Sequence, residues 1–123
     1  MKLQYKGVVY IKYYIGADLG TSALKLLLVN NKGEILNSVT KSYKVSFPNP
    51  GWSEQNPVDW LNAFFDGVLE LTQNFSTEKI HGIGIGGQMH GLMVLDDKDK
   101  VIRPDILGND GRTAQQTEYS KKV

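Results

Sequence analysis

The order of the expected elements is the feature that most constrains the fold of this chain. Strand-like apolar segments occupy Tyr13–Ala17 and Ala23–Val29, with a short connection between them. The sequence Asn-Asn-Lys-Gly at residues 30–33 predicts a hairpin turn, because Asn and Gly tolerate positive φ. A long return strand is expected over Glu34–Ser46. Short connections join antiparallel neighbours, so the first part of the chain is predicted to form three meandering antiparallel strands.

A helix is predicted after an irregular, proline-rich connection, FPNPGWSEQNPVDW at residues 47–60. Asn56 can cap this helix, Pro57 suits its first position, and Asp59 can accept hydrogen bonds from the free amides of the first turn. The helix is expected to end near Asn74. Apolar side chains recur at helical spacing and predict one stripe that packs on a core: Val58, Leu61, Phe65, Val68 and Leu69.

The segment after the helix alternates like a strand. In KIHGIGIGGQMHG, residues 79–91, His81, Ile83 and Ile85 share one face, and glycines dominate the other. A face of glycines lets a ligand or another segment approach the backbone closely. A parallel return beside the first strand needs a crossover connection, which the predicted helix supplies.

Shorter elements are expected toward the end of the chain. Leu92–Leu95 and Val101–Arg103 predict two short strands around a turn at residues 96–99, and a helix is expected from Gly111 or Thr113 onward. The whole order predicts an α/β fold with a mixed sheet, in which three antiparallel strands are followed by a helix and a parallel strand.

Composition limits the classes of function. A chain of 123 residues is about one small domain, and its net charge of +1 predicts neither nucleic acid nor an anionic membrane as a partner. It has no cysteine, which excludes disulfides, thiolate zinc sites and cysteine nucleophiles. The longest apolar run near the start, Val8–Ile11, is too short for a signal peptide or a membrane span. A cytoplasmic protein is therefore expected, with residues 1–12 as an extra leader.

The connection between the first two strands, DLGTS at residues 18–22, is richer in polar groups than a hairpin requires. A plain hairpin turn explains Gly20 alone, and it remains the alternative for so short a motif. Asp18 ends an apolar strand, where a carboxylate is costly unless a partner such as Mg²⁺ on nucleotide phosphates compensates it. Gly20 would let backbone amides approach a phosphate, and the hydroxyls of Thr21 and Ser22 could donate hydrogen bonds to it.

Gln88, Met89 and His90 directly follow the predicted parallel strand. Ligands of α/β sheets tend to lie beyond the carboxyl ends of strands. Glutamine and histidine can hydrogen-bond sugar hydroxyls, and methionine offers an adaptable apolar wall. An ordinary loop histidine is the alternative for His90. Trp52 and Trp60 flank a helix start, so they are expected to be packing anchors and not sugar platforms.

Four motifs occur in an order and spacing typical of one enzyme family: DLGTS, GWSEQNPVDW, GIGGQMHG and ILGNDGR. The set resembles the FGGY-type sugar kinases and, within them, the kinases that act on xylulose. The resemblance covers about Tyr14–Arg112. One such motif would be a weak signal, whereas four in order are specific.

The resemblance implies the actin-like ATPase fold, in which two ribonuclease-H-like domains close over ATP and a sugar. It implies that Asp18 lies near Mg²⁺, which it would bind through water, and near the transferred phosphate. It also implies that Gly20, Thr21 and Ser22 lie beside the phosphates of ATP.

The same resemblance assigns part of a sugar pocket. The Met-His pair of the family's QMHG motif contacts the sugar, which corresponds to Met89 and His90, with Gln88 beside them. Asn109 and Asp110 match a segment that lines the same side of the cleft. The implied reaction is the transfer of a phosphate from ATP, with Mg²⁺, to D-xylulose to give xylulose 5-phosphate.

Two departures from the family pattern are visible. Gly108 stands where the family usually has tryptophan, which removes a large apolar surface near the sugar. The family's catalytic aspartate comes much later in its sequence, and its C-terminal, adenosine-binding domain comes later still. Residues 13–123 are therefore expected to be a partial N-terminal domain, truncated before its last strand, inactive on its own and prone to self-association.

Two alternatives to a xylulose kinase stay open. A gluconate kinase or another polyol kinase of the same family is possible, because the Met-His pair is not unique to enzymes for xylulose. A module that only binds nucleotide or sugar, or only serves as a folding unit, is possible because the base is missing.

Overall fold

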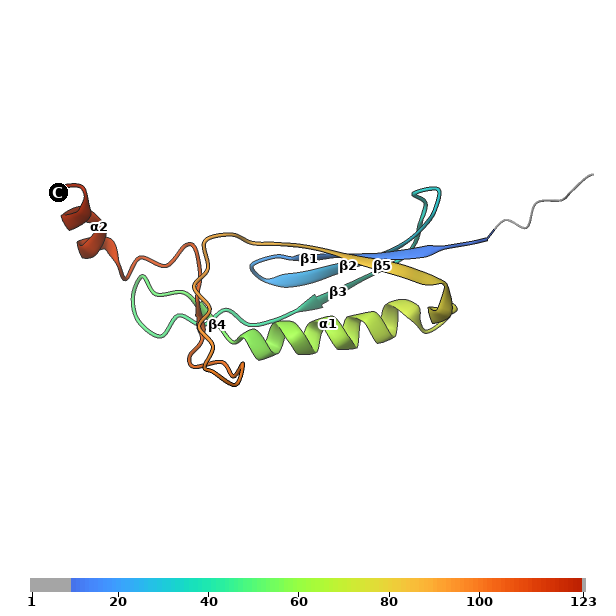
Figure 1. The fold of residues 1–123 in the computed structure, drawn as a ribbon. Coiled ribbons are helices and arrows are strands. Elements are labelled where there is room, and N and C mark those ends of the chain that lie inside the picture. Colours follow the sequence, from blue (N-terminus) through green and yellow to red (C-terminus); the bar gives the residue numbers. More distant parts are fainter. Residues whose placement is uncertain (1–9, 123) are drawn as a thin grey trace, which may run out of the picture.

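The computed structural model describes residues 10–122, and its main feature is a mixed sheet of four strands (Figure 1). The strands are β1 (Tyr13–Leu19), β2 (Ala23–Asn30), β3 (Ile35–Ser42) and β5 (Ile80–Gly87), in the order β3-β2-β1-β5. The β1–β2 and β2–β3 pairs are antiparallel, whereas β5 is parallel to β1. The predicted α/β fold, with three antiparallel strands followed by a helix and a parallel strand, is confirmed.

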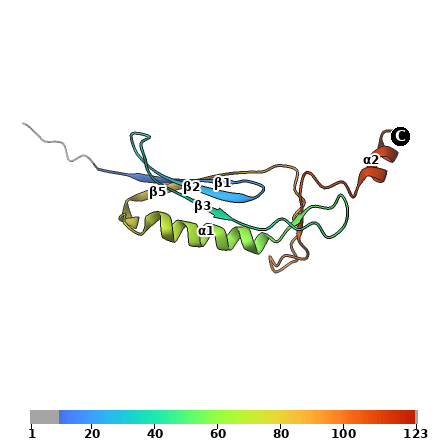
Figure 2. The same cartoon turned by 180° about the vertical axis from the view of Figure 1, so that it is seen from behind.

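Helix α1 (Pro57–Thr72) connects the antiparallel strands to β5 and lies along one face of the sheet (Figure 1). The view from behind shows α1 on that same side of the sheet (Figure 2). Its start is as predicted: Pro57 occupies the first turn, and the Asn56 side chain accepts a hydrogen bond of 3.1 Å from the amide of Val58. The helix ends at Thr72, slightly before the predicted Asn74.

The core lies between α1 and the sheet. Leu26 and Leu28 of β2 are 0 % exposed, as is Leu71 of α1. Burying a side chain of this size contributes about 1.5–3 kcal/mol, so these residues dominate the packing energy. The buried apolar cluster consists of Ile15, Ala17, Leu24, Leu26, Leu28, Val39, Ala63 and Leu71.

Most of the predicted apolar stripe of α1 does not face this core, and Val68 is the one member of the stripe that packs against it. Ala63 and Gly67 are buried against the sheet, and a Cβ added to Gly67 would lie only 2.5 Å from Cδ1 of Leu26. Small side chains allow the helix to approach closely, so they decide which face is buried. Four residues of the predicted stripe are exposed: Val58, Leu61, Phe65 and Leu69.

Part of the sheet on the α1 side is also uncovered. Ile83 and Ile85 of β5 pair with Ile15 and Ala17 of β1, so their side chains lie on the face that α1 packs against. Helix α1 contacts chiefly β2 and β3, which leaves Ile83 51 % and Ile85 71 % exposed. Large apolar side chains are therefore exposed both on α1 and on β5.

A second, two-stranded sheet forms beyond the end of the first. It pairs β4 (Glu54–Gln55) with β6 (Asp105–Ile106). The predicted return strand to Ser46 is too long, because β3 ends at Ser42 and Ser46 forms only an isolated bridge to Glu54. Ser42 already pairs with Ala23, the first residue of β2, so β2 offers no partner to a longer β3.

The predicted hairpin at residues 92–103 is present only as isolated bridges. Leu95 bridges Val101, while Leu92 bridges Ile106 instead of its expected partner. The turn between them is closed by the Asp96 side chain, which accepts hydrogen bonds from two backbone amides.

The remaining elements are two short helices. A 3₁₀ helix, η1 (Thr77–Lys79), precedes β5, and α2 (Ala114–Ser120) begins after Thr113, as predicted. Helix α2 lies beyond the end of the four-stranded sheet (Figure 1).

The expected leader lies mostly outside the described residues, which begin at Tyr10. Residues 10–12 have no regular structure before β1. Within residues 10–122, no helix is both long enough and apolar enough to cross a bilayer.

Asp105 of β6 is a buried carboxyl group, only 2 % exposed. It lies so close to Gly91 that a Cβ added to that glycine would be 2.8 Å from Oδ2 of Asp105. Burial raises the pKa of Asp105, and the positive charge of Arg103 opposes this rise in part.

We expect Gly67→Ala to lower the free energy of unfolding by about 1–3 kcal/mol, because the added methyl group collides with the fully buried Leu26. Helix propensity alone would predict the opposite sign. Chemical denaturation measures the change. Gly84→Ala is the matched control, since an added Cβ there meets nothing within 4 Å. Equal or greater stability of Gly67→Ala would contradict this packing.

We expect Asp105→Asn to raise the free energy of unfolding at pH 7 by about 1 kcal/mol, because it removes a buried charge. The pKa of Asp105 is higher in the folded state, so stability is greatest below the unfolded-state pKa and falls as pH rises through the folded-state pKa. The advantage of the variant should therefore shrink as pH is lowered. Denaturation curves across pH test this, with the exposed Asp97→Asn as control, and a constant difference at every pH would disprove it.

Candidate functional site

Two polar segments meet at one end of the four-stranded sheet. The turn at residues 20–22 follows β1, and the loop at residues 88–90 follows β5. Because β1 and β5 are parallel neighbours, Leu19 pairs with Gly87, and the Gln88 amide donates a 2.9 Å hydrogen bond to the Leu19 carbonyl. The carboxyl ends of two strands thus bring together the two motifs that the sequence singled out.

A hollow of about 290 Å³ lies where these segments meet. Five of the residues predicted to bind ligands line it, together with Gly108: Thr21, Gln88, Met89, His90 and Asn109. Met89 is 74 % exposed, so its side chain is available to a ligand.

His90 has an unusual backbone conformation, with φ at 66°, in the left-handed region that is uncommon for residues other than glycine. Gly108 packs closely against it. A Cβ added to Gly108 would lie 2.9 Å from the Met89 carbonyl oxygen and 3.2 Å from the Cβ of His90. A larger residue at position 108 would therefore require the loop that carries His90 to move. Strained backbone of this kind is often found at ligand-binding positions.

Thr21 and Gln88 are joined to each other. The Thr21 hydroxyl donates a 3.1 Å hydrogen bond to Oε1 of Gln88, so the phosphate turn and the loop at residues 88–90 are directly connected. Nε2 of Gln88 donates to Oε1 of Gln55 at 3.3 Å. Gln88 therefore uses part of its hydrogen-bonding capacity for contacts within the protein.

Gln55 is a residue that the sequence reasoning missed. Its side chain is 2 % exposed and lies between three segments of the chain. Nε2 donates to the carbonyls of Thr21, at 2.5 Å, and Lys44, at 3.4 Å, while Oε1 accepts from the indole of Trp60 at 3.1 Å. The motif GWSEQNP contains Gln55, but its partners lie far away in sequence. Trp60 serves as a packing anchor, as expected.

Asp18 lies at the end of β1, where Lys25 of β2 and Gly86 of β5 are its paired neighbours. Asp18 is exposed, so the expectation that its carboxylate needs compensation for burial is wrong. The glycines at positions 16 and 84 leave the sheet surface open beside it. A hollow of about 360 Å³ is lined by Gly16, Ala17, Asp18, Lys25, Leu27 and Gly84.

Tyr43, just after β3, supports the same turn. Its hydroxyl donates a hydrogen bond to the Gly20 carbonyl, and its amide donates to the Ser22 carbonyl at 3.1 Å. Burial raises the pKa of Tyr43, and the negative charge of Asp18 raises it further. The phenol therefore stays protonated and remains a donor at neutral pH.

Asp110 and Asn109 have different surroundings. The Asp110 carboxylate accepts from the Ser53 amide at 2.6 Å and from Arg112, whose Nη2 lies 2.7 Å away. These hydrogen bonds, led by the one from Arg112, hold the pKa of Asp110 well below its usual range. Asn109 is exposed at the rim of the 290 Å³ hollow. Asp110 is thus engaged by the protein, whereas Asn109 is open to a ligand.

Arg112 also connects this loop to β4. Nη2 of Arg112 lies 2.8 Å from Oε1 of Glu54, and its guanidinium lies 3.8 Å from the ring centre of Trp52. Arg103 reaches the same Glu54 oxygen at 2.6 Å. The cluster fastens the segment that carries Asn109 to the connection before α1.

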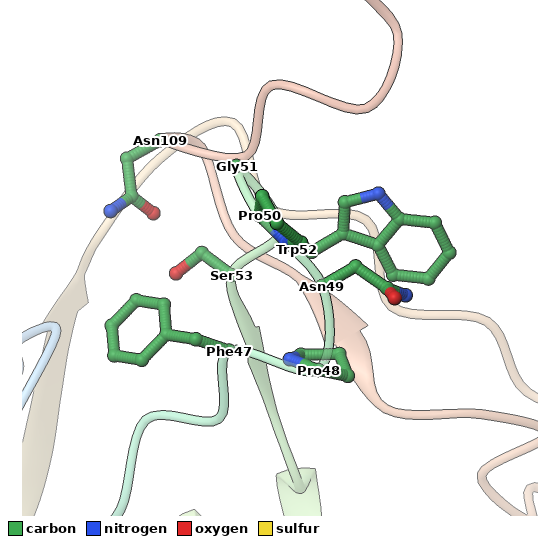
Figure 3. Close-up of a pocket in the computed structure, with 8 residues that line it drawn as sticks. All are labelled: Phe47, Pro48, Asn49, Pro50, Gly51, Trp52, Ser53 and Asn109. Atoms are coloured by element: carbon green, nitrogen blue, oxygen red, sulfur yellow. The ribbon is translucent and has the colours of Figure 1, made fainter.

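Another hollow, of about 430 Å³, lies beside Asn109 (Figure 3). Residues 47–53 form its remaining wall, and the Trp52 side chain points away from Asn109. None of the residues that line it is an acid or a base, so it cannot supply proton transfer.

Comparisons with known proteins agree with this arrangement. A family model described as the FGGY family of carbohydrate kinases, N-terminal domain, matches residues 13–122. A xylulose kinase from Escherichia coli is 46 % identical over 103 residues, which are 84 % of this chain and 21 % of that enzyme. The chain therefore spans about a fifth of the length of the curated relatives it matches.

Solved structures show the same fold. A ligand-bound xylulose kinase from Lactobacillus acidophilus has a TM-score of 0.86 at 31 % identity, over 90 % of this chain and 22 % of that one. A gluconate kinase from the same organism has a TM-score of 0.87 at 30 % identity, over 91 % of this chain and 23 % of that one. The actin-like ATPase fold implied by the motifs is confirmed. This chain belongs to the FGGY family of carbohydrate kinases, whose N-terminal domain it matches.

Proposed function

We propose that this chain supplies the phosphate-binding turn and part of the sugar pocket of a kinase that transfers a phosphate from ATP to D-xylulose, giving xylulose 5-phosphate. The observation that carries the proposal is the hydrogen-bonded contact between Thr21 of the turn and Gln88 of the predicted sugar loop. Phosphoryl transfer requires the two substrates to be held side by side, and this contact joins the segments proposed to bind them. The 46 % identity to a xylulose kinase supports the choice of sugar.

The turn is suited to the phosphates of ATP. Gly20 allows the tight turn, since a Cβ there would lie 3.0 Å from the Ala23 carbonyl oxygen, and Thr21 and Ser22 are exposed with their hydroxyls and amides. Asp18 offers one exposed carboxylate for Mg²⁺. No group of three or more His, Cys, Asp or Glu side chains suited to a metal occurs within residues 10–122. A lone carboxylate suits Mg²⁺, which keeps several waters and neutralises phosphate charge when bound.

The sugar would occupy the 290 Å³ hollow. Met89 provides an apolar wall, while His90 and Asn109 can hydrogen-bond hydroxyl groups. Gln88 retains part of its capacity for the sugar. Asp110 acts on the sugar pocket by holding the segment that carries Asn109, since its carboxylate is bonded to Arg112 and Ser53.

We assign no catalytic base within residues 10–122. Asp105 is buried against Gly91, and Asp110 is bonded to Arg112. Neither carboxylate is free to take a proton from a sugar hydroxyl. We therefore propose that the activity needs the rest of a kinase and that the 123-residue chain alone has none.

A gluconate kinase is the second candidate, because the structure of one such enzyme matches as well as that of a xylulose kinase. The test places residues 13–122 in the matching position of the Escherichia coli xylulose kinase. Formation of ADP is then measured with D-xylulose, with gluconate and without sugar. Activity with D-xylulose alone supports the proposal, and activity with gluconate alone supports the second candidate. A folded chimera that binds neither sugar nor ATP would show that the segment is only a folding unit.

We expect Asp18→Ala in this chimera to lower kcat by about 10²-fold or more, because it removes the carboxylate proposed to position Mg²⁺ and the phosphate. The KM for D-xylulose should change less than about threefold, because the sugar hollow does not include Asp18. Steady-state kinetics measure both values. Asp97→Ala, at an exposed turn, is the control, and an unchanged kcat for Asp18→Ala would rule out this role.

We expect His90→Asn to raise the dissociation constant for D-xylulose by about 5- to 100-fold, because the shorter amide no longer reaches the sugar hydroxyl that the imidazole would bond in a closed cleft. Asn tolerates the left-handed backbone at this position, so the change removes the imidazole without adding strain. Calorimetry on the chimera gives the constant. His81→Asn, on the exposed part of β5, should leave it unchanged, and similar constants for both variants would make His90 an ordinary loop residue.

A further inference from the structure

The turn at residues 20–22 has three successive carbonyl groups that are all held from outside the turn. The Gly20 carbonyl accepts from the Tyr43 hydroxyl, and the Ser22 carbonyl accepts from the Tyr43 amide at 3.1 Å. The Thr21 carbonyl between them accepts from Nε2 of Gln55 at 2.5 Å. Two side chains from different segments thus fix the orientation of the whole turn.

Fixing the carbonyls also fixes the amides. In a trans peptide the N–H group points opposite to the preceding C=O group, and the described chain has no cis peptide bond. The amides of Thr21 and Ser22 therefore point away from Tyr43 and Gln55. Among residues 10–122, neither amide donates to a protein acceptor, and both residues are exposed. Successive free amides of this kind form a binding site for an anion.

The orientation of the Gln55 amide is itself determined. The Trp60 indole can only donate, so the atom of Gln55 that faces it must be oxygen. Nε2 consequently faces the carbonyls of Thr21 and Lys44, which can only accept. A glutamate at this buried position would place an oxygen against two carbonyl oxygens. The site therefore requires the amide, and not merely a side chain of this size.

We propose that Tyr43 and Gln55 are positioning residues that aim the Thr21 and Ser22 amides at a phosphate group of the nucleotide. The proposal rests on the kinase function proposed above and assigns these residues no contact with substrate. Gln55 also accepts from Nε2 of Gln88, so one buried amide supports both the phosphate turn and the start of the sugar loop.

The test uses the 123-residue chain labelled with ¹⁵N and titrated with pyrophosphate, and separately with Mg·ATP, while the amide signals are followed by NMR. In the parent chain, the Thr21 and Ser22 signals should move and saturate. Tyr43→Phe, which removes one hydroxyl, should raise the dissociation constant for pyrophosphate about three- to tenfold, and Gln55→Glu should raise it about tenfold or more.

Matched controls separate positioning from general effects on the chain. Tyr119→Phe and Gln115→Glu change exposed residues of α2 by the same chemistry and should leave the constant within about twofold. Core signals, such as those of Leu26 and Leu28, report whether each variant is folded. Should Gln55→Glu fail to fold, Tyr43→Phe still decides the question.

The inference is overturned if Tyr43→Phe binds pyrophosphate as tightly as the parent chain, or if the parent's Thr21 and Ser22 signals do not respond. These outcomes differ from failure of the proposed function, which is judged by sugar-dependent ADP formation in the chimera. If the chimera is inactive but the variants of the 123-residue chain show the expected order of pyrophosphate affinities, the anion site stands and the proposed kinase function is wrong. If the chimera is active but Tyr43→Phe binds pyrophosphate as tightly as the parent chain, the kinase function stands and the positioning role is wrong.

Discussion

Strand β1 has a different kind of neighbour on each side, and the rest of the structure depends on this. Its antiparallel partner β2 follows after a tight turn, whereas its parallel partner β5 can be reached only through the crossover helix α1. The turn after β1 and the loop after β5 must therefore emerge at the same edge of the sheet. This topology brings Thr21 and Gln88 within hydrogen-bonding distance of each other.

Buried polar groups then determine how the emerging loops are held. Gln55 has little exposed surface, and such a group is tolerated only because both atoms of its amide are hydrogen-bonded. Glu54, its neighbour in β4, faces a different set of partners and pairs with Arg103 and Arg112. Two adjacent residues thus fasten separate loops, one through neutral hydrogen bonds and the other through charge.

Local signals allowed most of the fold to be predicted. The Asn56-Pro57 start of α1 and the Asn-Gly turn at residues 30–33 are determined by residues that are adjacent in sequence. The buried face of α1 was predicted wrongly except at Val68, because Ala63 and Gly67 contribute little to an apolar pattern. Their small size nevertheless determines which side of the helix can approach Leu26.

Residues of the candidate site could be predicted only where they lie in a recognisable sequence motif. Thr21, Gln88 and His90 were expected to bind ligands, and the structure places them around one hollow. Tyr43 and Gln55 gave no signal in the sequence, because their partners are backbone carbonyls that any sequence provides.

The exposed apolar side chains of α1 have a consequence for folding kinetics. They are Val58, Leu61, Phe65 and Leu69. Contacts of α1 with β2 and β3 precede, in sequence, the pairing of β1 with β5, so the core can form while these side chains are exposed. Apolar surface that is exposed during folding promotes association between chains.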